Sequence, residues 1–185
     1  MTLEKYFSKY YVASSLSYRE SILFGRDRLN VCTEAFDSII LPLLSTEHLT
    51  FIADGQQYTR SQKTARIADY DLAQKALNVC VNARETTAKN CSYCPKCLRT
   101  LMTLESLGKL DNFSSAFDLK TYRKHRFGYA CKQRVRYSFD PFAKDNVDLA
   151  RKNGKYIAPF PVAVVFSLPA IFKHIYKKII TMIRK

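Results

Sequence analysis

The sequence predicts an α/β protein, in which part of a parallel sheet with helices precedes a small metal-bearing helical subdomain and a basic C-terminal helix. Three observations support this fold class. Strand-like and helix-like segments alternate in the first 80 residues, four cysteines cluster over residues 80–97, and positive charge is concentrated in the last third. The predicted boundaries are 1–79 for the α/β region, 80–125 for the cysteine subdomain, 126–155 for a basic linker or helical region and 156–185 for the tail.

The α/β region is predicted from four segments in order. Residues 9–14 (KYYVAS) are typical of a strand, and residues 33–45 have helical apolar spacing, with Thr33 as the cap and Pro42 as a kink or end. Residues 49–54 (LTFIAD) predict a buried strand before Gly55, and residues 61–78 a helix broken near Tyr70. The order strand, helix, strand, helix favours parallel strands.

Candidate binding residues follow these predicted strands, because ligands of parallel sheets usually bind at the carboxyl ends of the strands. Ser14 and Ser15 follow the first strand, and Asp54 and Gly55 end the second. Arg60 and Lys63, three residues apart, would share a helix face near its N-terminus, an arrangement suited to a phosphate or carboxylate. Ordinary surface charges are the alternative interpretation.

The second region contains the pattern C-x10-C-x2-C-x2-C, formed by Cys80, Cys91, Cys94 and Cys97. Four thiolates at such spacing predict a tetrahedral zinc site with no open position, and hence a structural rather than a catalytic metal. Pro95 suits the first position of a helix that Cys94 would cap and that Gly108 would end.

Two alternatives to zinc remain at this point. C-x2-C-x2-C also opens a bacterial ferredoxin run, although no Cys-Pro follows three residues later. Disulfides or free thiols are the other alternative, and no secretory signal precedes the cluster. Cys32 and Cys131 lie outside the pattern, and the spacing leaves open whether Cys80 or Cys131 completes the site.

Net charge is distributed unevenly along the chain. Residues 1–119 hold 14 Lys and Arg against 13 Asp and Glu, whereas residues 120–185 hold 16 against 3. Residues 156–172 carry no charge, and residues 172–185 have the spacing of a basic amphipathic helix. Possible partners of residues 120–185 are an anionic membrane surface, the protein's own core, or nucleic acid, to which residues 124–139 would contribute cations and aromatic rings. A membrane span is disfavoured by the prolines at 159, 161 and 169.

Several segments resemble the C-terminal half of a bacterial family of the adenine nucleotide alpha hydrolase superfamily, the PP-loop ATP pyrophosphatases. The most specific is NCSYCPKCLRTLMTLESLGKL, which is similar to the family pattern Asn-Cys-Gly-x-Cys-x-Lys-Cys-Leu-Arg-Thr, with Ser92 in place of glycine. The stretch from Tyr58 to Lys63 resembles a second family segment, with Gln62 at a usually acidic position. The cysteine arrangement is also similar to the zinc site of 7-cyano-7-deazaguanine synthases.

This resemblance, over residues 10–125, implies a partial Rossmann-like sheet and a role in ATP-dependent modification of a small molecule, in cell-surface polysaccharide biosynthesis. The family's glycine-rich pyrophosphate loop is absent from this chain, whose five glycines lie at least 20 residues apart. ATP would therefore bind only if a partner chain supplied the loop, and catalytic residues are not identified. Reduced thiols favour a cytoplasmic location, with the tail at the inner face of the membrane. A zinc-stabilised nucleic-acid-binding module and a peripheral membrane adaptor are the alternative functions.

Overall fold

The computed structural model describes residues 5–25, 36–80 and 90–169. Contacts within the chain divide it into two compact units, Met1–Lys63 (unit 1) and Thr64–Lys185 (unit 2). The division falls within a single helix, α3 (Arg60–Ile67). The boundaries of the four regions expected from the sequence stay predictions, and the two units are described separately below.

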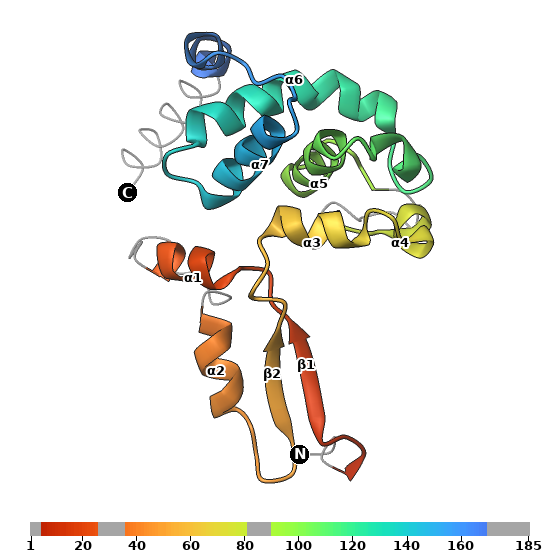
Figure 1. The fold of residues 1–185 in the computed structure, drawn as a ribbon, viewed down its shortest axis with the longest axis vertical. Coiled ribbons are helices and arrows are strands. Elements are labelled where there is room, and N and C mark those ends of the chain that lie inside the picture. Colours follow the sequence, from red (N-terminus) through yellow and green to blue (C-terminus); the bar gives the residue numbers. More distant parts are fainter. Residues whose placement is uncertain (1–4, 26–35, 81–89, 170–185) are drawn as a thin grey trace, which may run out of the picture. The chain divides into compact units, whose positions relative to one another are not determined.

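Unit 1 contains a two-stranded parallel sheet (Figure 1). Strand β1 (Lys9–Ala13) pairs with β2 (Thr50–Asp54), with Lys9 opposite Thr50 and Ala13 opposite Asp54. Two helices connect the strands, α1 (Tyr18–Gly25) and α2 (Asp37–Leu43), and α2 contacts β2. The predicted α/β class and the parallel direction are thus confirmed, whereas a full Rossmann-like sheet is not shown.

Two of the elements predicted for unit 1, the second strand and the helix that contains Pro42, can be compared in detail with the structure. The prediction of a buried second strand is wrong, because the end residues of β2 are exposed and its three central residues are only half-buried. A two-stranded sheet has no neighbouring strands to enclose it. Pro42 lies within α2, which ends one residue later, as its missing N–H and its ring predict. Thr33, the expected cap, lies outside the described residues.

Unit 2 is helical. Its described elements are α4 (Asp71–Ala76), α5 (Pro95–Ser106), the 3-10 helix η3 (Leu110–Phe113), α6 (Leu119–Arg136) and α7 (Pro141–Lys152), and residues 160–169 are also helical. Helices α5, α6 and α7 contact one another (Figure 1). The break between α3 and α4 falls at residues 68–70, so the predicted interruption near Tyr70 is confirmed.

The start and end of α5 follow from local sequence. Cys94 is its N-cap and Pro95 its first residue, as predicted. Gly108 adopts a φ of +71° just past the end, and the following N–H of Lys109 donates to the Leu104 carbonyl at 2.9 Å. One face of α5 enters the core, which also includes η3 and aromatic residues of α6. The buried apolar residues on this face of α5 are Leu98, Leu101, Met102 and Leu104.

Within the described part of the chain, no helix has the length and apolar character needed to cross a bilayer. The amphipathic helix predicted for residues 172–185 lies outside the described residues.

Candidate metal centre and candidate binding site

The four cysteines of the predicted metal site lie together in unit 2. The sulfur atoms of Cys80, Cys91, Cys94 and Cys97 all lie within 4.8 Å of one another. The Cys97 Sγ is 3.4 Å from that of Cys94 and 3.8 Å from that of Cys91. Zinc–sulfur bonds of about 2.3 Å in a tetrahedron imply sulfur–sulfur distances of about 3.8 Å. The cluster could therefore hold one metal ion such as zinc.

The structure resolves which cysteine is the fourth member. Cys131 is buried in a separate small apolar cluster with Ala158 and Ala163, whereas Cys80 belongs to the metal-competent group. The described cysteines are all free thiols, so no disulfide competes with this grouping among them. Cys32 lies outside the described residues.

Backbone N–H groups point at two of the sulfur atoms. The Cys94 N–H donates to the Cys91 sulfur at 3.3 Å, and the Cys97 N–H donates to the Cys94 sulfur at 3.5 Å. The second of these bonds is the cap of α5. Such donors stabilise the negative charge of a thiolate and hold it in place for a metal. The same turn that begins the helix thus orients the ligands.

Ser92 occupies a left-handed conformation between the first two ligands of this turn, with a φ of +62°. That conformation is one that favours glycine. The buried serine makes two hydrogen bonds that glycine would lack. Its hydroxyl donates to the Asn90 carbonyl at 3.2 Å and accepts from the Asp118 N–H at 2.9 Å. These contacts connect the turn to the start of α6.

Asn90 links the segment before Cys91 to the segment before Cys80. Its Oδ1 accepts from the Val79 N–H at 2.8 Å, and its Nδ2 donates to the carbonyls of Leu77 at 2.7 Å and Ala116 at 2.9 Å. The side chain is buried. This single amide therefore positions the fourth ligand beside the other three, although Cys80 is remote from them in sequence.

Burial raises the pKa of the Cys91 and Cys97 thiols above their usual value. In the metal-free protein these thiols keep their protons at neutral pH. A metal ion must displace the protons on binding, so metal affinity increases with pH.

In unit 1, the predicted binding residues Ser14 and Lys63 are in contact. The Lys63 Nζ donates to the Ser14 carbonyl oxygen at 2.5 Å, and the Ser14 hydroxyl donates to the Asp37 carboxylate at 3.1 Å. The stem of Lys63 passes Gly55, where a Cβ would lie 3.4 Å from the Lys63 Cε. Lys63 thus joins the carboxyl ends of β1 and β2, which is where the sequence predicts a ligand.

The charge of Lys63 is less favoured than that of an ordinary lysine. Burial lowers its pKa most, the positive charge of Arg60 lowers it further, and Glu20 and Asp54 act in the opposite direction. Lys63 is already bonded to a backbone carbonyl, so its first role is to hold the two strand ends together. Arg60, in the first turn of α3, is the other cation that the sequence predicts at this site. Ser15, the fourth predicted residue, is half-buried.

Three polar residues of unit 1 were not expected from the sequence to belong to a site. Glu20, Ser21 and Gln56 are all buried, and each has side-chain atoms without a hydrogen-bond partner among the described residues. Gln56 is only 1% exposed, and neither its Oε1 nor its Nε2 has such a partner. Buried polar atoms are normally satisfied, so a bound water, ion or polar molecule is needed to supply partners to these atoms.

A local sequence signal could have located Glu20. Ser17 and Glu20 form a capping box, in which the Ser17 N–H donates to Glu20 Oε2 at 2.7 Å and the Glu20 N–H donates to the Ser17 hydroxyl at 3.3 Å. The other carboxylate oxygen, Oε1, is left without a partner. Thr59 and Gln62 form the same motif at the start of α3. Glutamine serves there as well as glutamate.

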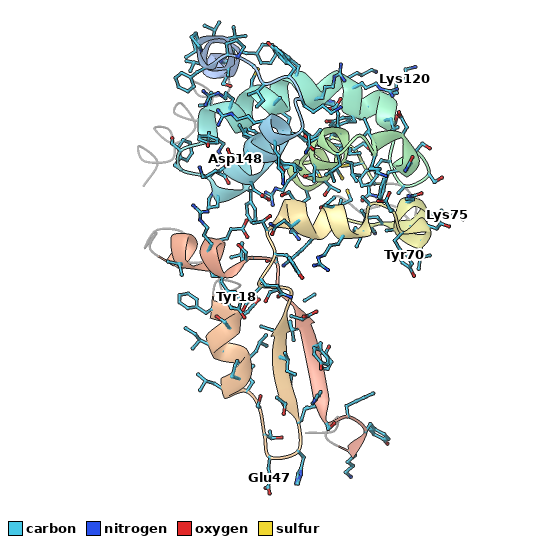
Figure 2. The ribbon with its side chains drawn as sticks, in the orientation of Figure 1. Tyr18, Glu47, Tyr70, Lys75, Lys120 and Asp148 are labelled. Atoms are coloured by element: carbon cyan, nitrogen blue, oxygen red, sulfur yellow. The ribbon has the colours of Figure 1, made fainter. Side chains whose placement is uncertain are left out.

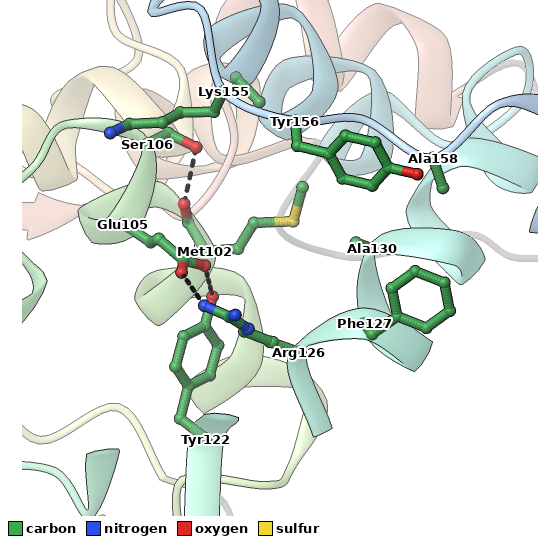
Figure 3. A pocket seen from close by; sticks show the side chains of 11 residues that line it. Met102, Glu105, Ser106, Tyr122, Arg126, Phe127, Ala130, Lys155, Tyr156 and Ala158 are labelled. Carbon is green, nitrogen blue, oxygen red and sulfur yellow. Dashed lines mark hydrogen bonds and ion pairs between the residues drawn. The ribbon is translucent and has the colours of Figure 1, made fainter. Parts of the chain in front are cut away.

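Unit 2 contains a hollow of about 200 Å³ between α5, α6 and residues 155–158 (Figure 3). Two of the charges on its wall are paired with each other, and Lys155 contributes a further positive charge. Glu105 accepts from Arg126 at 2.8 Å and from the Tyr122 hydroxyl at 2.6 Å. Much of the remaining lining is apolar and comes from Met102, Phe127, Ala130, Ala150 and Ala158. The hollow is thus largely apolar, with the Glu105–Arg126 pair and Lys155 as its charged groups.

The aromatic residues proposed for nucleic-acid stacking in residues 124–139 are largely occupied. Tyr129 is buried, the Tyr137 hydroxyl donates to Asp148 at 2.8 Å, and Phe127 packs edge-on against Phe166 at 5.0 Å between ring centres. Phe139 is exposed. Lys120, the first basic residue of α6, is exposed at the surface (Figure 2).

Comparison of the chain with protein-family models, with curated proteins and with solved structures finds no match.

Proposed function

We propose that this chain is a metal-stabilised domain that binds a polar, anionic small molecule and contributes to its ATP-dependent modification. The buried, unsatisfied amide of Gln56 carries the proposal, because it lies in unit 1 together with Glu20, Ser21, Ser14 and Lys63. A ligand that both donates and accepts hydrogen bonds would satisfy it. The ATP-dependent step rests on the resemblance to PP-loop enzymes, as does the assignment to cell-surface polysaccharide biosynthesis.

The sheet of unit 1 supports the proposed partner that supplies the pyrophosphate loop. Parallel sheets are normally covered on both faces and rarely consist of two strands. Here β1 is almost wholly exposed, and α2 has no buried residue. Four large apolar side chains of α2 and its cap are exposed, namely Ile39, Ile40, Leu43 and Leu44. Further strands from the partner would cover these surfaces and complete the nucleotide site.

In this proposal, the zinc ion holds the cysteine subdomain rigid and takes no part in the reaction. The four thiolates fill its tetrahedral coordination, so the ion supplies folding energy rather than a reactive position. The chain without its partner is expected not to hydrolyse ATP.

Binding of AMP and of pyrophosphate, measured by titration calorimetry, tests the anion site. Arg60→Ala should weaken binding at least about tenfold, because a hydrogen bond to a charged group contributes about 1.5–3 kcal/mol. The matched control is Lys75→Ala, which removes an exposed cation from α4 (Figure 2). It should bind like the wild type. Equal affinities of wild type and Arg60→Ala, or no binding of either anion by the wild type, would remove Arg60 from the proposed site.

A further inference from the structure

The side chain of Tyr93 is exposed on a turn that is itself held in place. Tyr93 lies between the candidate ligands Cys91 and Cys94 and is 51% exposed. Both of its neighbours are buried and hydrogen-bonded, Ser92 through its hydroxyl and Cys94 through its N–H. A tyrosine on such a turn loses little conformational freedom when a partner covers its ring, because only two side-chain torsions remain to be fixed. The ring is therefore available for stacking.

The Tyr93 ring lies beside the first turns of α6. The Asp118 N–H, at the N-cap of α6, donates to the Ser92 hydroxyl at 2.9 Å. Further along the helix, the centre of the His125 ring lies 6.2 Å from that of Tyr93, and the ring planes meet at 45°. The two rings are tilted and not stacked face to face, and His125 is exposed as well. Two exposed rings from segments far apart in sequence thus meet at one place.

The first half of α6 carries two lysines available to an anionic partner. The helix contains seven Lys and Arg residues and no Asp or Glu. Three of them, Arg123, Arg126 and Arg136, form ion pairs with acidic residues of other segments. Lys120 and Lys124 are exposed, and neither forms an ion pair with any of the described residues. Because they are four residues apart, they lie on one side of the helix, about 6 Å apart along its axis.

The charge around the two rings is positive. Residues 90–104 and 119–139, which supply the rings and the lysines, contain no Asp or Glu. The carboxylate of Asp118, the residue before α6, is engaged in capping the helix through the N–H groups of Lys120 and Thr121. The partner of this surface should therefore be anionic and should present flat groups for stacking.

Single-stranded nucleic acid combines these two properties. Its backbone carries phosphates along its whole length, and its unpaired bases stack on exposed aromatic side chains. A duplex matches less well, because its bases are already stacked on one another. An anionic membrane also matches less well, because a membrane-binding surface needs an apolar face that enters the lipid. Tyr93, His125, Lys120 and Lys124 all carry polar groups and provide no such face.

We infer that Tyr93, His125, Lys120 and Lys124 (the Tyr93 surface) bind single-stranded nucleic acid. Tyr93 stacks on an unpaired base, and His125 borders the same base. Lys120 and Lys124 contact phosphates of the same strand. All four residues belong to unit 2, so this binding activity goes beyond the proposed function and needs none of the anion-binding residues of unit 1.

Fluorescence anisotropy of a labelled oligouridylate of about ten nucleotides, with the zinc-loaded chain, tests the stacking. Tyr93→Ala should weaken binding at least about fivefold, because one stacked base is lost. Tyr93→Phe keeps the ring and should bind within about twofold of the wild type. The matched control is Tyr70→Ala, because Tyr70 is 60% exposed at the start of α4 in the same unit (Figure 2). It should bind like the wild type.

The salt dependence of binding tests the two lysines. Each phosphate contact on a single strand contributes about 0.7 to the slope of log affinity against log salt concentration. The double variant K120A/K124A should therefore reduce this slope by about 1.4. Lys75→Ala, which removes an exposed cation from α4, should leave the slope unchanged (Figure 2). Zinc content and far-UV circular dichroism identify a misfolded variant, and K120A/K124A decides if Tyr93→Ala is one.

Oligodeoxyuridylate in the same assay separates DNA from RNA as the bound strand, and binding of either supports the inference. Binding of neither overturns it. Equal affinities of the wild type and folded Tyr93→Ala, an equal loss in Tyr70→Ala, or an unchanged slope in K120A/K124A would overturn it as well.

Two further outcomes would assign the Tyr93 surface to another partner and overturn the inference. Duplex RNA bound as tightly as the single strand would show that no base stacks on Tyr93. Binding to phosphatidylserine vesicles in place of either oligonucleotide would assign the lysines to a membrane surface.

Discussion

Replacing Asn90 by alanine should separate the fourth metal ligand from the other three. The Asn90 side chain makes three hydrogen bonds of 2.7–2.9 Å to backbone groups of Leu77, Val79 and Ala116. Each contributes about 1 kcal/mol net, so their removal should lower the free energy of unfolding by about 3 kcal/mol. Zinc affinity should also fall, by about tenfold to a hundredfold, because the segment that carries Cys80 loses its attachment.

Urea denaturation of the zinc-loaded protein measures the first effect, and competition with a chromophoric chelator measures the second. Because the chain has two units, the absorption of cobalt(II) in place of zinc provides a probe of the metal site alone. Asn78→Ala is the control, since this exposed residue makes a single bond of 3.2 Å to the Cys80 N–H. This substitution should lower the free energy of unfolding by less than about 1 kcal/mol. The role assigned to the Asn90 side chain would be refuted if the free energies of unfolding of the wild type and of Asn90→Ala differed by less than about 0.5 kcal/mol.

Two further predictions concern the two candidate sites. Cys80→Ser should reduce the zinc content below one ion per chain and lower the melting temperature. A chelator should lower the melting temperature of the wild type but hardly that of the variant. A wild-type protein that contains no zinc, or that contains iron, would contradict the zinc assignment. Gln56→Leu should stabilise the ligand-free protein by about 1–3 kcal/mol, since it removes a buried unsatisfied amide, and should abolish AMP binding. Unchanged AMP binding in a stabilised variant would show that the amide does not contact the ligand.

The metal site was largely predictable because ligand spacing and helix capping are local properties. Pro95 and Cys94 begin α5, and Gly108 ends it, through backbone preferences that act within a few residues. The sequence favoured Cys80 as the fourth ligand but left Cys131 open. The grouping of Cys80 with the other three cysteines, the hydrogen bonds of Asn90 and the separate burial of Cys131 decide for Cys80.

The binding site was predictable only in part. Ser14 and Lys63 were expected together because parallel strands end at the same edge of a sheet. Gln56, Glu20 and Ser21 were not expected, since an isolated glutamine or serine carries no sequence signal of burial. The capping motif at Ser17 and Glu20 was visible, but it predicts a helix start and says nothing of the second carboxylate oxygen.

The sequence by itself determined the two parallel strands with a helix between them and a broken helix after them, the grouping of three cysteines at one helix start and the excess of positive charge after residue 120. Helix α1 was not expected. These properties depend on neighbours within a few residues or on composition alone. Tertiary structure decided which cysteine completes the cluster, which polar side chains are buried without partners, and that the exposed ring of Tyr93 lies beside α6. Each of those properties depends on contacts between segments far apart in the chain, and the chain's local pattern does not encode them.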